Sequence, residues 1–442
     1  MSGRTSSNYI IKPGGKLQGH LRIPGDKSIS HRALMLAAIA EGQTRITGFL
    51  TGEDTLATLA AFQAMGVKVD CQPGDTIIVD GVGMHGLCAP AKPLDLGNSG
   101  TSVRLLAGLL AGQSFDSVLT GDASLQRRPM RRITEPLQMM QADVTCSDEG
   151  TLPLHIHGGR SLHGIDYELP VPSAQLKSCL LLAALYAHGK TCVHEPVVTR
   201  DHTERLLQVF GYPSESKDKS YTVYGGSILK ATTINIPGDI SSAAFFLVGA
   251  CVAEGSSIVL ENVGNNPTRN AVIPILQAMG ADISVLNERT VSGEMVADIE
   301  VRSSTLHGID IPVDQVAVAI DEFPAILIAA ATADGKTTLT GAAELRVKES
   351  DRITAMAEGL QAIGIETETF ADGMTVQGGQ IRGGTINSYG DHRIAMAFAM
   401  AGLVATNAIN ILDCANVDTS FPGFVNLGRR AGLNIKEDKH YK

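Results

Sequence analysis

One short pattern recurs six times along the 442 residues and limits what the chain can fold into. It reads bulky residue, Gln, spacer, bulky residue, Gly, and successive copies start about 64 to 84 residues apart. The copies are 62–66, 137–141, 207–211, 276–280, 360–364 and a degenerate 424–428. Each is typical of an amphipathic helix that ends at a left-handed glycine. Short alternating runs such as 67–70 and 281–285 follow and favour strands. The chain is therefore predicted to contain six similar units.

A second, Ala-rich helix pattern repeats at the same interval. Its copies cover about 28–41, 99–111, 173–188, 240–254, 321–334 and 391–405. A helix that is apolar nearly all round belongs in a core. Each unit should thus have one buried helix, one amphipathic helix and several strands. Six units in this length suggest two domains of three units, divided near residue 237, where Ile236-Pro237-Gly238 opens the fourth unit.

Composition excludes several classes of protein. The formal net charge is −10, with no basic domain, which argues against a nucleic-acid-binding protein. The seven cysteines are odd in number and contain no C-x-x-C pair, so a reducing compartment is expected rather than a disulfide framework. The N-terminus has no apolar signal region, and the longest apolar runs, such as 394–405, are shorter than the roughly 20 residues of a membrane span. We expect a cytoplasmic protein.

Polar residues of particular kinds precede the buried helices. The six starts are Gly25-Asp26-Lys27-Ser28, Gly97-Asn98-Ser99-Gly100-Thr101, Ser173-Ala174-Gln175, Gly238-Asp239-Ile240-Ser241, Asp321-Glu322 and Asp391-His392-Arg393. Helix N-termini offer unpaired N–H groups and a partial positive charge, so converging starts would favour an anionic ligand. Helix capping is the simpler explanation of each motif alone. It does not explain Lys27, Arg32 or Arg393.

Two basic clusters strengthen this prediction. Residues 127–132 contain four Arg, and 346–352 combines three cations with two acids. Arg presents forked donors suited to phosphate and carboxylate. Glu349, beside Lys348, is a titratable acid with a cation at hand.

The motifs together, in this order, resemble the EPSP synthases over essentially the whole chain. The strings are GDKSISHR at 25–32, LGNSGTSVRL at 96–105, GDASLQRRPM at 121–130, VPSAQLKS at 171–178, DEFP at 321–324, RVKESDR at 346–352 and DHRIAM at 391–396. SAQLK at 173–177, RDHTE at 200–204 and NPTR at 266–269 are similar to the second, bacterial class. The resemblance implies an α/β fold of two inside-out barrels, each with three βαβαββ-type units. It also places 1–20 with 237–442 in one domain and 21–236 in the other.

The resemblance further implies transfer of the enolpyruvyl group of phosphoenolpyruvate to the 5-hydroxyl of shikimate 3-phosphate. Asp321, Glu349 and Lys27 match the catalytic residues, Asp321 as the acceptor of the hydroxyl proton and Glu349 as the acid in proton exchange at the methylene. Matches to the shikimate 3-phosphate site are Lys27, Ser28, Arg32, Ser173, Gln175 and Lys348. Matches to the phosphoenolpyruvate site are Lys27, Gly100, Arg128, Gln175, Arg352 and Arg393. Asn98, Thr101, Ala174 and His392 complete the expected substrate-binding set.

No step of this reaction needs redox chemistry or a Lewis acid, so neither cofactor nor metal is expected. The family inhibitor glyphosate and a monomeric state are further expectations. One departure concerns the string 417–422, which lacks the Lys that many members carry before Thr/Ser-Phe-Pro. The resemblance therefore supplies no residue here for one phosphoenolpyruvate contact.

Other interpretations remain open at this point. The sister transferase acting on UDP-N-acetylglucosamine shares the fold but typically has a reactive Cys in the loop matching 122–130, where this chain has none. Residues 81–86 form a literal G-x-G-x-x-G, but the Pro-containing sequence after it does not favour the helix that dinucleotide binding requires. A non-catalytic repeat scaffold would explain the repeats but not the charged helix starts. Metal binding by His155-x-His157 or by 200–204 lacks a further ligand set.

Overall fold

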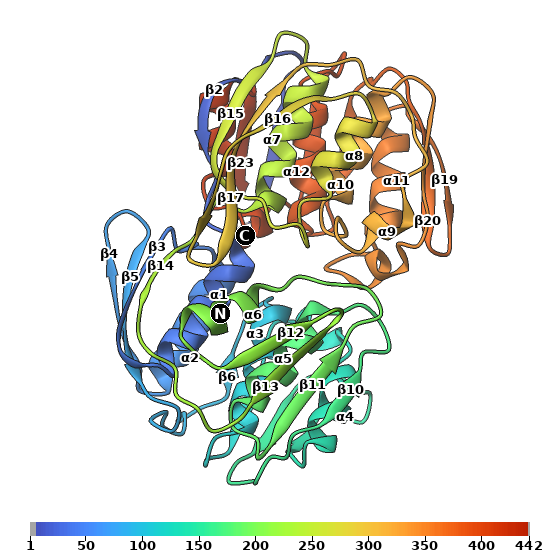
Figure 1. The fold of residues 1–442 in the computed structure, drawn as a ribbon. Coiled ribbons are helices and arrows are strands. Elements are labelled where there is room, and N and C mark those ends of the chain that lie inside the picture. The colour runs from blue at the N-terminus through green and yellow to red at the C-terminus, as the bar shows by residue number, and fades with distance from the viewer. Residues whose placement is uncertain (1–5, 441–442) are drawn as a thin grey trace. The chain divides into compact units, whose positions relative to one another are not determined.

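The computed structural model describes residues 6–440, so residues 1–5 and 441–442 of the predicted second domain lie outside the described residues. The chain forms two compact units. Unit 1 contains the described residues up to Pro24, Pro237–Arg289 and those from Met295 onward. Unit 2 contains Gly25–Ile236 and Thr290–Glu294. Each unit combines several sheets with several helices (Figure 1).

Unit 2 contains three four-stranded sheets of the same design. Their orders are β14(Thr233–Asn235)-β3(Glu41–Thr47)-β5(Thr76–Val82)-β4(Lys68–Gln72), β6(Leu94–Asp95)-β7(Ser117–Thr120)-β9(Leu154–His157)-β8(Asp143–Thr145) and β10(Asp166–Glu168)-β11(Lys190–His194)-β13(Ser220–Tyr224)-β12(Ser214–Lys217). In each sheet the first pair is parallel and the other two are antiparallel. Three copies of one topology confirm the predicted repeat.

Unit 1 also contains three sheets. Their orders are β16(Asp282–Val291)-β17(Glu294–Arg302)-β15(Ser257–Gly264)-β2(Gln18–Arg22), β18(Lys336–Leu339)-β20(Gly373–Gln377)-β19(Glu366–Phe370) and β21(Gly384–Asn387)-β22(Ile409–Leu412)-β1(Ser6–Ile11)-β23(Ile435–His440). Strand β1 pairs antiparallel with β22 and β23, and β2 pairs parallel with β15. The N-terminal strands thus complete sheets that the C-terminal half begins.

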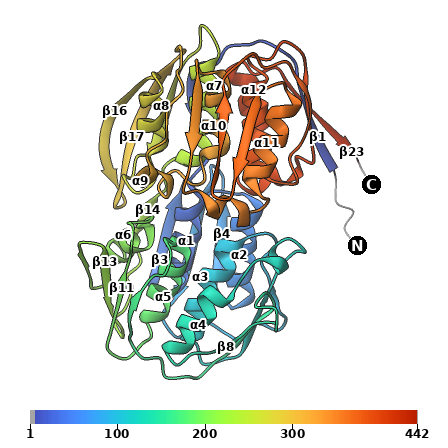
Figure 2. The same ribbon diagram turned by 90° about the vertical axis from the view of Figure 1, so that its right-hand side faces the viewer.

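Each sheet is accompanied by one buried and one outer helix. The buried helices are α1(Lys27–Ala38), α3(Gly100–Ala111) and α5(Ala174–Ala184) in unit 2, and α7(Ile240–Val252), α10(Phe323–Thr332) and α12(His392–Ala401) in unit 1. The outer helices are α2(Glu53–Ala64), α4(Arg131–Met139), α6(His202–Val209), α8(Val272–Ala278), α11(Arg352–Ala362) and α13(Phe424–Ala431). Shorter helices are α9(Val313–Val316), η1(Leu125–Arg127), η2(Ala343–Val347) and η3(Ala415–Thr419). Figure 2 shows α7, α10 and α12 side by side, and they pack on one another.

Burial of the Ala-rich helices confirms the prediction that they form the cores. In α7 every residue from Ile240 to Cys251 is buried, and in α10 every residue from Phe323 to Ala331 is buried. Small side chains allow the helices to approach closely. A Cβ atom on Gly108 of α3 would lie 2.0 Å from the carbonyl oxygen of Cys179 in α5, so this position requires glycine.

The repeated helix ends follow the predicted glycine signal in four of six units. Gly66, Gly211, Gly280 and Gly364 have positive φ values between 74° and 99°. In the second unit Gln141 adopts the same region, with φ 67°. The prediction for 424–428 was wrong, because α13 continues through Gly428 to Ala431 and Gly432 adopts φ 116° instead. Within residues 6–440, no helix combines the length and apolarity that crossing a membrane would require.

Candidate active site

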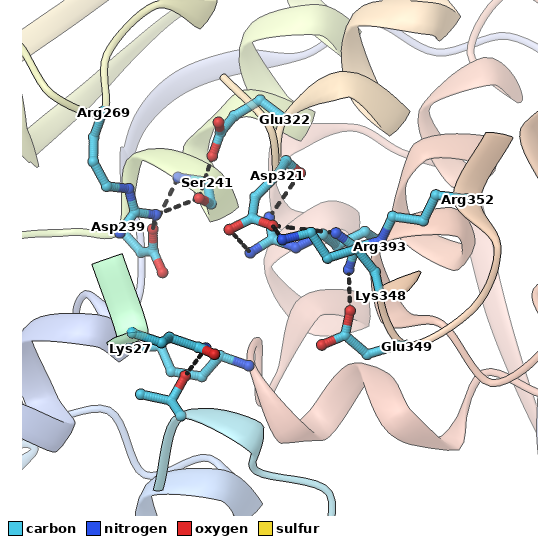
Figure 3. Close-up of polar contacts among 12 residues, drawn as sticks. Lys27, Asp239, Ser241, Arg269, Asp321, Glu322, Lys348, Glu349, Arg352 and Arg393 are labelled. Atoms are coloured by element: carbon cyan, nitrogen blue, oxygen red, sulfur yellow. Dashed lines mark hydrogen bonds and ion pairs between the residues drawn. The ribbon is translucent and has the colours of Figure 1, made fainter. Parts of the chain in front are cut away.

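The two predicted acid–base residues of unit 1 both accept hydrogen bonds from one guanidinium group, that of Arg352. Arg352, at the start of α11, has Nη1 3.2 Å from Oδ1 of Asp321 and Nη2 2.6 Å from Oε2 of Glu349. Its Nε donates to Oδ2 of Asp391 at 2.9 Å. Burial opposes the charge of Arg352, but Asp391, Glu349 and Asp321 outweigh it and raise the pKa above its ordinary value. The guanidinium therefore stays charged and orients both acids (Figure 3).

Two further cations approach Asp321. Nζ of Lys348 lies 3.9 Å from Oδ1 of Asp321, and Nη2 of Arg393 lies 3.9 Å from Oδ2. Arg393 also donates through Nη1 to the main-chain oxygen of Asp321 at 3.0 Å. Burial lowers the pKa of Lys348, and attraction to Asp321 and Glu344 only partly offsets it. These residues form a mixed charged cluster in which the Asp321 carboxylate is surrounded by cations.

Helix capping explains how the local sequence builds this cluster. Asp391 caps α12 by accepting from the Arg393 N–H at 2.9 Å, and the same carboxylate holds Arg352. One residue thus starts a helix and orients a functional side chain. His392, the first residue of α12, is only 4% exposed. The string 417–422, in which the expected Lys is missing, covers the end of η3 and the turn after it.

A buried polar network lies beside the cluster at the start of α7. Asp239 caps α7 and pairs with Arg269, with 3.1 Å between Oδ1 and Nη2. Arg269 donates to the Ser241 hydroxyl, which donates to Glu322. Glu322 directly follows Asp321 in the chain, so this network holds the segment that carries the predicted base (Figure 3).

In unit 2, Lys27 begins α1 and pairs with an acid from the next helix. Its Nζ lies 2.9 Å from Oδ2 of Asp54 in α2, and both side chains are largely buried. Asp26 caps α1 by accepting from the Ile29 N–H at 2.8 Å. The cap positions Lys27 at the helix start, where the peptide dipoles and the ammonium group both favour an anion.

Arg32 connects three helices of unit 2. Its Nε donates to the Thr203 hydroxyl of α6 at 2.7 Å, and its Nη2 donates to the Ser178 hydroxyl of α5 at 2.8 Å. Nη1 donates to the main-chain oxygen of Ser28 at 3.0 Å. Bonds to neutral oxygens orient a guanidinium group without cancelling its charge. These three bonds fix the orientation of the Arg32 guanidinium group.

The starts of α3 and α5 are joined by a second set of bonds. Nε2 of Gln175 donates to the Thr101 hydroxyl at 3.0 Å, and its Oε1 accepts from Arg104 at 2.5 Å. Ser173 caps α5, and Ala174 is its first residue. Arg128 donates to Oδ1 of Asn98 at 2.7 Å. A Cβ atom on Gly100 would lie 3.0 Å from Nη1 of Arg128 and 3.4 Å from Nη1 of Arg104.

The predicted residues of unit 1 that form one connected set are Asp321, Lys348, Glu349, Arg352 and Arg393, and those of unit 2 lie in several sets of bonds at the starts of α1, α3 and α5. Sequence reasoning missed Asp54, Arg104 and the Arg269–Ser241–Glu322 network as parts of these sets. Arg104 lies in a string that was singled out, and its position one turn after Gly100 was the available signal. No sequence signal pointed to Asp54, because its pairing with Lys27 depends on how α2 packs on α1.

Together, the sixfold repeat, the cationic helix starts and the acid pair on Arg352 are those of a two-unit α/β enzyme for anionic substrates. A sequence model of the family "EPSP synthase (3-phosphoshikimate 1-carboxyvinyltransferase)" matches residues 11–427. The chain belongs to the EPSP synthase family, and it is an enzyme of the transferase class.

Curated relatives and solved structures agree with this assignment. The chain is 60% identical over 431 residues to the 3-phosphoshikimate 1-carboxyvinyltransferase of Nitrosococcus oceani, covering 98% of this chain and 97% of that one. It is 61% identical to the enzyme of the same name from Alkalilimnicola ehrlichii over 428 residues, covering 97% and 96%. The solved EPSP synthase of Acinetobacter baumannii superposes with a TM-score of 0.89 at 53% identity, covering 98% and 100%.

Proposed function

We propose that the chain transfers the enolpyruvyl group of phosphoenolpyruvate to the 5-hydroxyl of shikimate 3-phosphate, with release of phosphate. The observation that carries this proposal is Arg352, which holds Asp321 and Glu349 on the two ends of one guanidinium group. The reaction needs a proton acceptor at the hydroxyl and a proton donor at the methylene carbon. Two carboxylates oriented by one buried cation fit that requirement.

Unit 1 supplies the acid–base chemistry in this proposal. Asp321 accepts the hydroxyl proton as the oxygen attacks C2, and Glu349 exchanges a proton with C3. A tetrahedral ketal phosphate forms, C3 then returns its proton, and phosphate leaves. Arg352 and Arg393 compensate the charge of phosphoenolpyruvate, and Lys348 that of the phosphate group of shikimate 3-phosphate. Burial lowers the pKa of Lys348, so a bound anion beside it would stabilise its charged form.

Unit 2 supplies recognition of the anionic groups. Shikimate 3-phosphate is held by Lys27, Ser28, Arg32, Ser173 and Gln175, and phosphoenolpyruvate by Lys27, Gly100, Arg128 and Gln175. Asn98 and Thr101 act by positioning, since Asn98 accepts from Arg128 and Thr101 from Gln175. Ala174 and His392 line the helix starts. Support comes from the hydroxyl partners of Arg32 and the amide partner of Arg128, which fix the geometry of these guanidinium groups.

The test is phosphate release from phosphoenolpyruvate with each of two acceptors. Shikimate 3-phosphate should support turnover, and UDP-N-acetylglucosamine should not. The absence of a Cys within 122–130 favours the first acceptor. Turnover with the nucleotide sugar alone would replace this proposal by the sister reaction. Failure to bind either acceptor together with phosphoenolpyruvate would favour a scaffold.

We further propose that glyphosate competes at the phosphoenolpyruvate site, where Gly100 leaves room for it. A methyl group at this position would approach Nη1 of Arg128 to 3.0 Å, tighter than ordinary contact. Gly100→Ala should therefore raise the glyphosate concentration that halves turnover. Inhibition unchanged in this variant would contradict the proposed role of Gly100.

The protein is also proposed to act as a cytoplasmic monomer with domains 21–236 and 1–20 plus 237–442. Free thiols at seven cysteines support a reducing compartment. Light scattering on the purified protein tests the monomer, and fractionation of cells tests the location. Expression of 21–236 alone tests that domain, which should give a cooperative unfolding transition of its own.

A further inference from the structure

Three side chains with metal-ligand chemistry share one face of the sheet β10-β11-β13-β12. Asp166 on β10 lies opposite Cys192 on β11 in the parallel register, and His194 follows two residues later. Because side chains alternate along a strand, Cys192 and His194 project to the same side, whereas Val193 belongs to the core on the other side. The backbone register therefore brings a carboxylate, a thiol and an imidazole together.

The three groups are close enough to share one ion. Nε2 of His194 lies 2.6 Å from Oδ1 of Asp166, and the Sγ of Cys192 accepts from the Thr222 hydroxyl of β13 at 3.4 Å. One ligand atom from each of the three lies within 4.8 Å of the other two. Among residues 6–440, this is the one group of three or more such residues that meets that criterion. The pair His155 and His157, which the sequence suggested as possible metal ligands, does not belong to such a group.

Coordination chemistry selects the class of ion. A tetrahedral zinc site with Zn–S of about 2.3 Å and Zn–N and Zn–O of about 2.0–2.2 Å needs ligand atoms about 3.3–3.8 Å apart. The Asp166–His194 pair, at 2.6 Å, would have to open by about 1 Å, and the thiol already lies within 4.8 Å of both partners. A thiolate and an imidazole favour Zn²⁺ over Mg²⁺ or Ca²⁺, which prefer oxygen ligands.

We propose that Asp166, Cys192 and His194 bind one zinc-type divalent cation, with water in the fourth position. The bound sulfur is a thiolate, so each ion that binds releases the thiol proton to the solvent. The ion has no step in enolpyruvyl transfer, and the site does not depend on the function proposed above. It cross-links β10 to β11 at the sheet edge. The alternative is an Asp–His ion pair beside a thiol that only packs.

The experiment is titration of the full, metal-stripped chain with Zn²⁺ against a chromophoric chelator. We expect one equivalent to bind. Cys192→Ser and His194→Gln should each weaken binding by more than the roughly 10–100-fold that loss of an outer-shell partner costs. Reconstitution with Co²⁺ should give a thiolate-to-cobalt charge-transfer band that Cys192→Ser removes.

Matched controls separate this site from other cysteines and histidines. Cys88 is an exposed free thiol in the same unit, and His157 forms a similar exposed pair with Asp116 at 3.3 Å without a thiol. Cys88→Ser and His157→Ala should leave the affinity and the cobalt band unchanged. If Cys192→Ser does not fold, Asp166→Asn, which changes an exposed residue, carries the test. The proposal is overturned if no equivalent binds, or if binding survives the Cys192, His194 and Asp166 substitutions.

Discussion

A buried triad in unit 2 gives the sharpest prediction about stability. Nζ of Lys177, on α5, lies 2.7 Å from Glu195 and 2.6 Å from Glu204, and the three side chains are 1%, 7% and 8% exposed. Burial opposes the charge of Lys177, but Glu204 and Glu195 outweigh it and raise the pKa. Burial raises the pKa of Glu204 despite the attraction of Lys177.

Lys177→Met should destabilise unit 2 strongly, because it leaves two buried carboxylates without this cation. Breaking a buried pair from one side costs about 3–5 kcal/mol. For a unit of about 200 residues, each kcal/mol lowers the melting temperature by about 2–4 °C. The transition of unit 2 should therefore fall by roughly 6–20 °C at neutral pH, measured by circular dichroism.

The pH dependence of this loss has a definite sign. Without Lys177, the pKa of Glu204 should rise further above that of the unfolded chain. A carboxyl group of this kind binds its proton more tightly in the folded state. Stability is therefore recovered as the pH falls through the raised pKa toward the unfolded value near 4.3. The difference between variant and wild type should shrink from pH 8 to pH 5.

A rescue and a control complete the experiment. Adding Glu204→Gln to Lys177→Met removes one buried charge and should recover part of the lost stability. Lys190→Met, at an exposed position on β11, should change the free energy of unfolding by less than about 0.5 kcal/mol. The reasoning is refuted if Lys177→Met melts at the same temperature as the wild type, or if its loss of stability grows as the pH is lowered.

Three further predictions concern other parts of the core. Arg269→Met should cost about 3–5 kcal/mol, and adding Asp239→Asn should recover part of it; additive losses in urea unfolding would show that the 3.1 Å pair is not coupled. Burial, with Lys27 and Arg32 nearby, lowers the pKa of His31, so the unfolded chain takes up a proton below about pH 6.5 that the folded chain does not. The stability of the wild type should therefore fall on acidification, by up to about 1.4 kcal/mol per pH unit, and His31→Gln should reduce this slope. A variant with the wild-type pH profile of melting would argue against this role of His31. Gly108→Ala should lower the free energy of unfolding, measured in urea, by at least the roughly 1–3 kcal/mol typical of overpacking, because the clash is with a backbone oxygen; an unchanged free energy of unfolding would contradict the close approach.

The core helices could be predicted from the sequence because their apolar character is local. The helices predicted at 240–254 and 391–405 correspond to α7, Ile240–Val252, and α12, His392–Ala401. The ends were less accurate where tertiary contacts decide them. The helix predicted at 173–188 ends at Ala184. Residues 185–188 instead form a turn, and its last residue, His188, makes a β-bridge to His163. Gly428 looked like a helix stop, but the α13 core position it fills cannot be read from a five-residue pattern.

The site was predictable to the extent that function coincides with helix capping and with family motifs. Asp391 is an example, because the residue that caps α12 also holds Arg352. Partners supplied by remote segments could not be predicted. Ser241 and Glu322 are 81 positions apart and meet only through the packing of α7 beside α10. The assigned roles of the predicted residues remain predictions.

The most direct measurement of the central claim is the rate of phosphate release by Asp321→Asn and Glu349→Gln with both substrates saturating. Each substitution keeps the shape of the side chain while removing one partner of the proton transfers, so turnover should fall by about 10²–10⁴-fold with the melting temperature retained. If either variant releases phosphate at nearly the wild-type rate, that carboxylate is not the acid–base group, and the chemistry assigned to the Arg352 cluster is wrong.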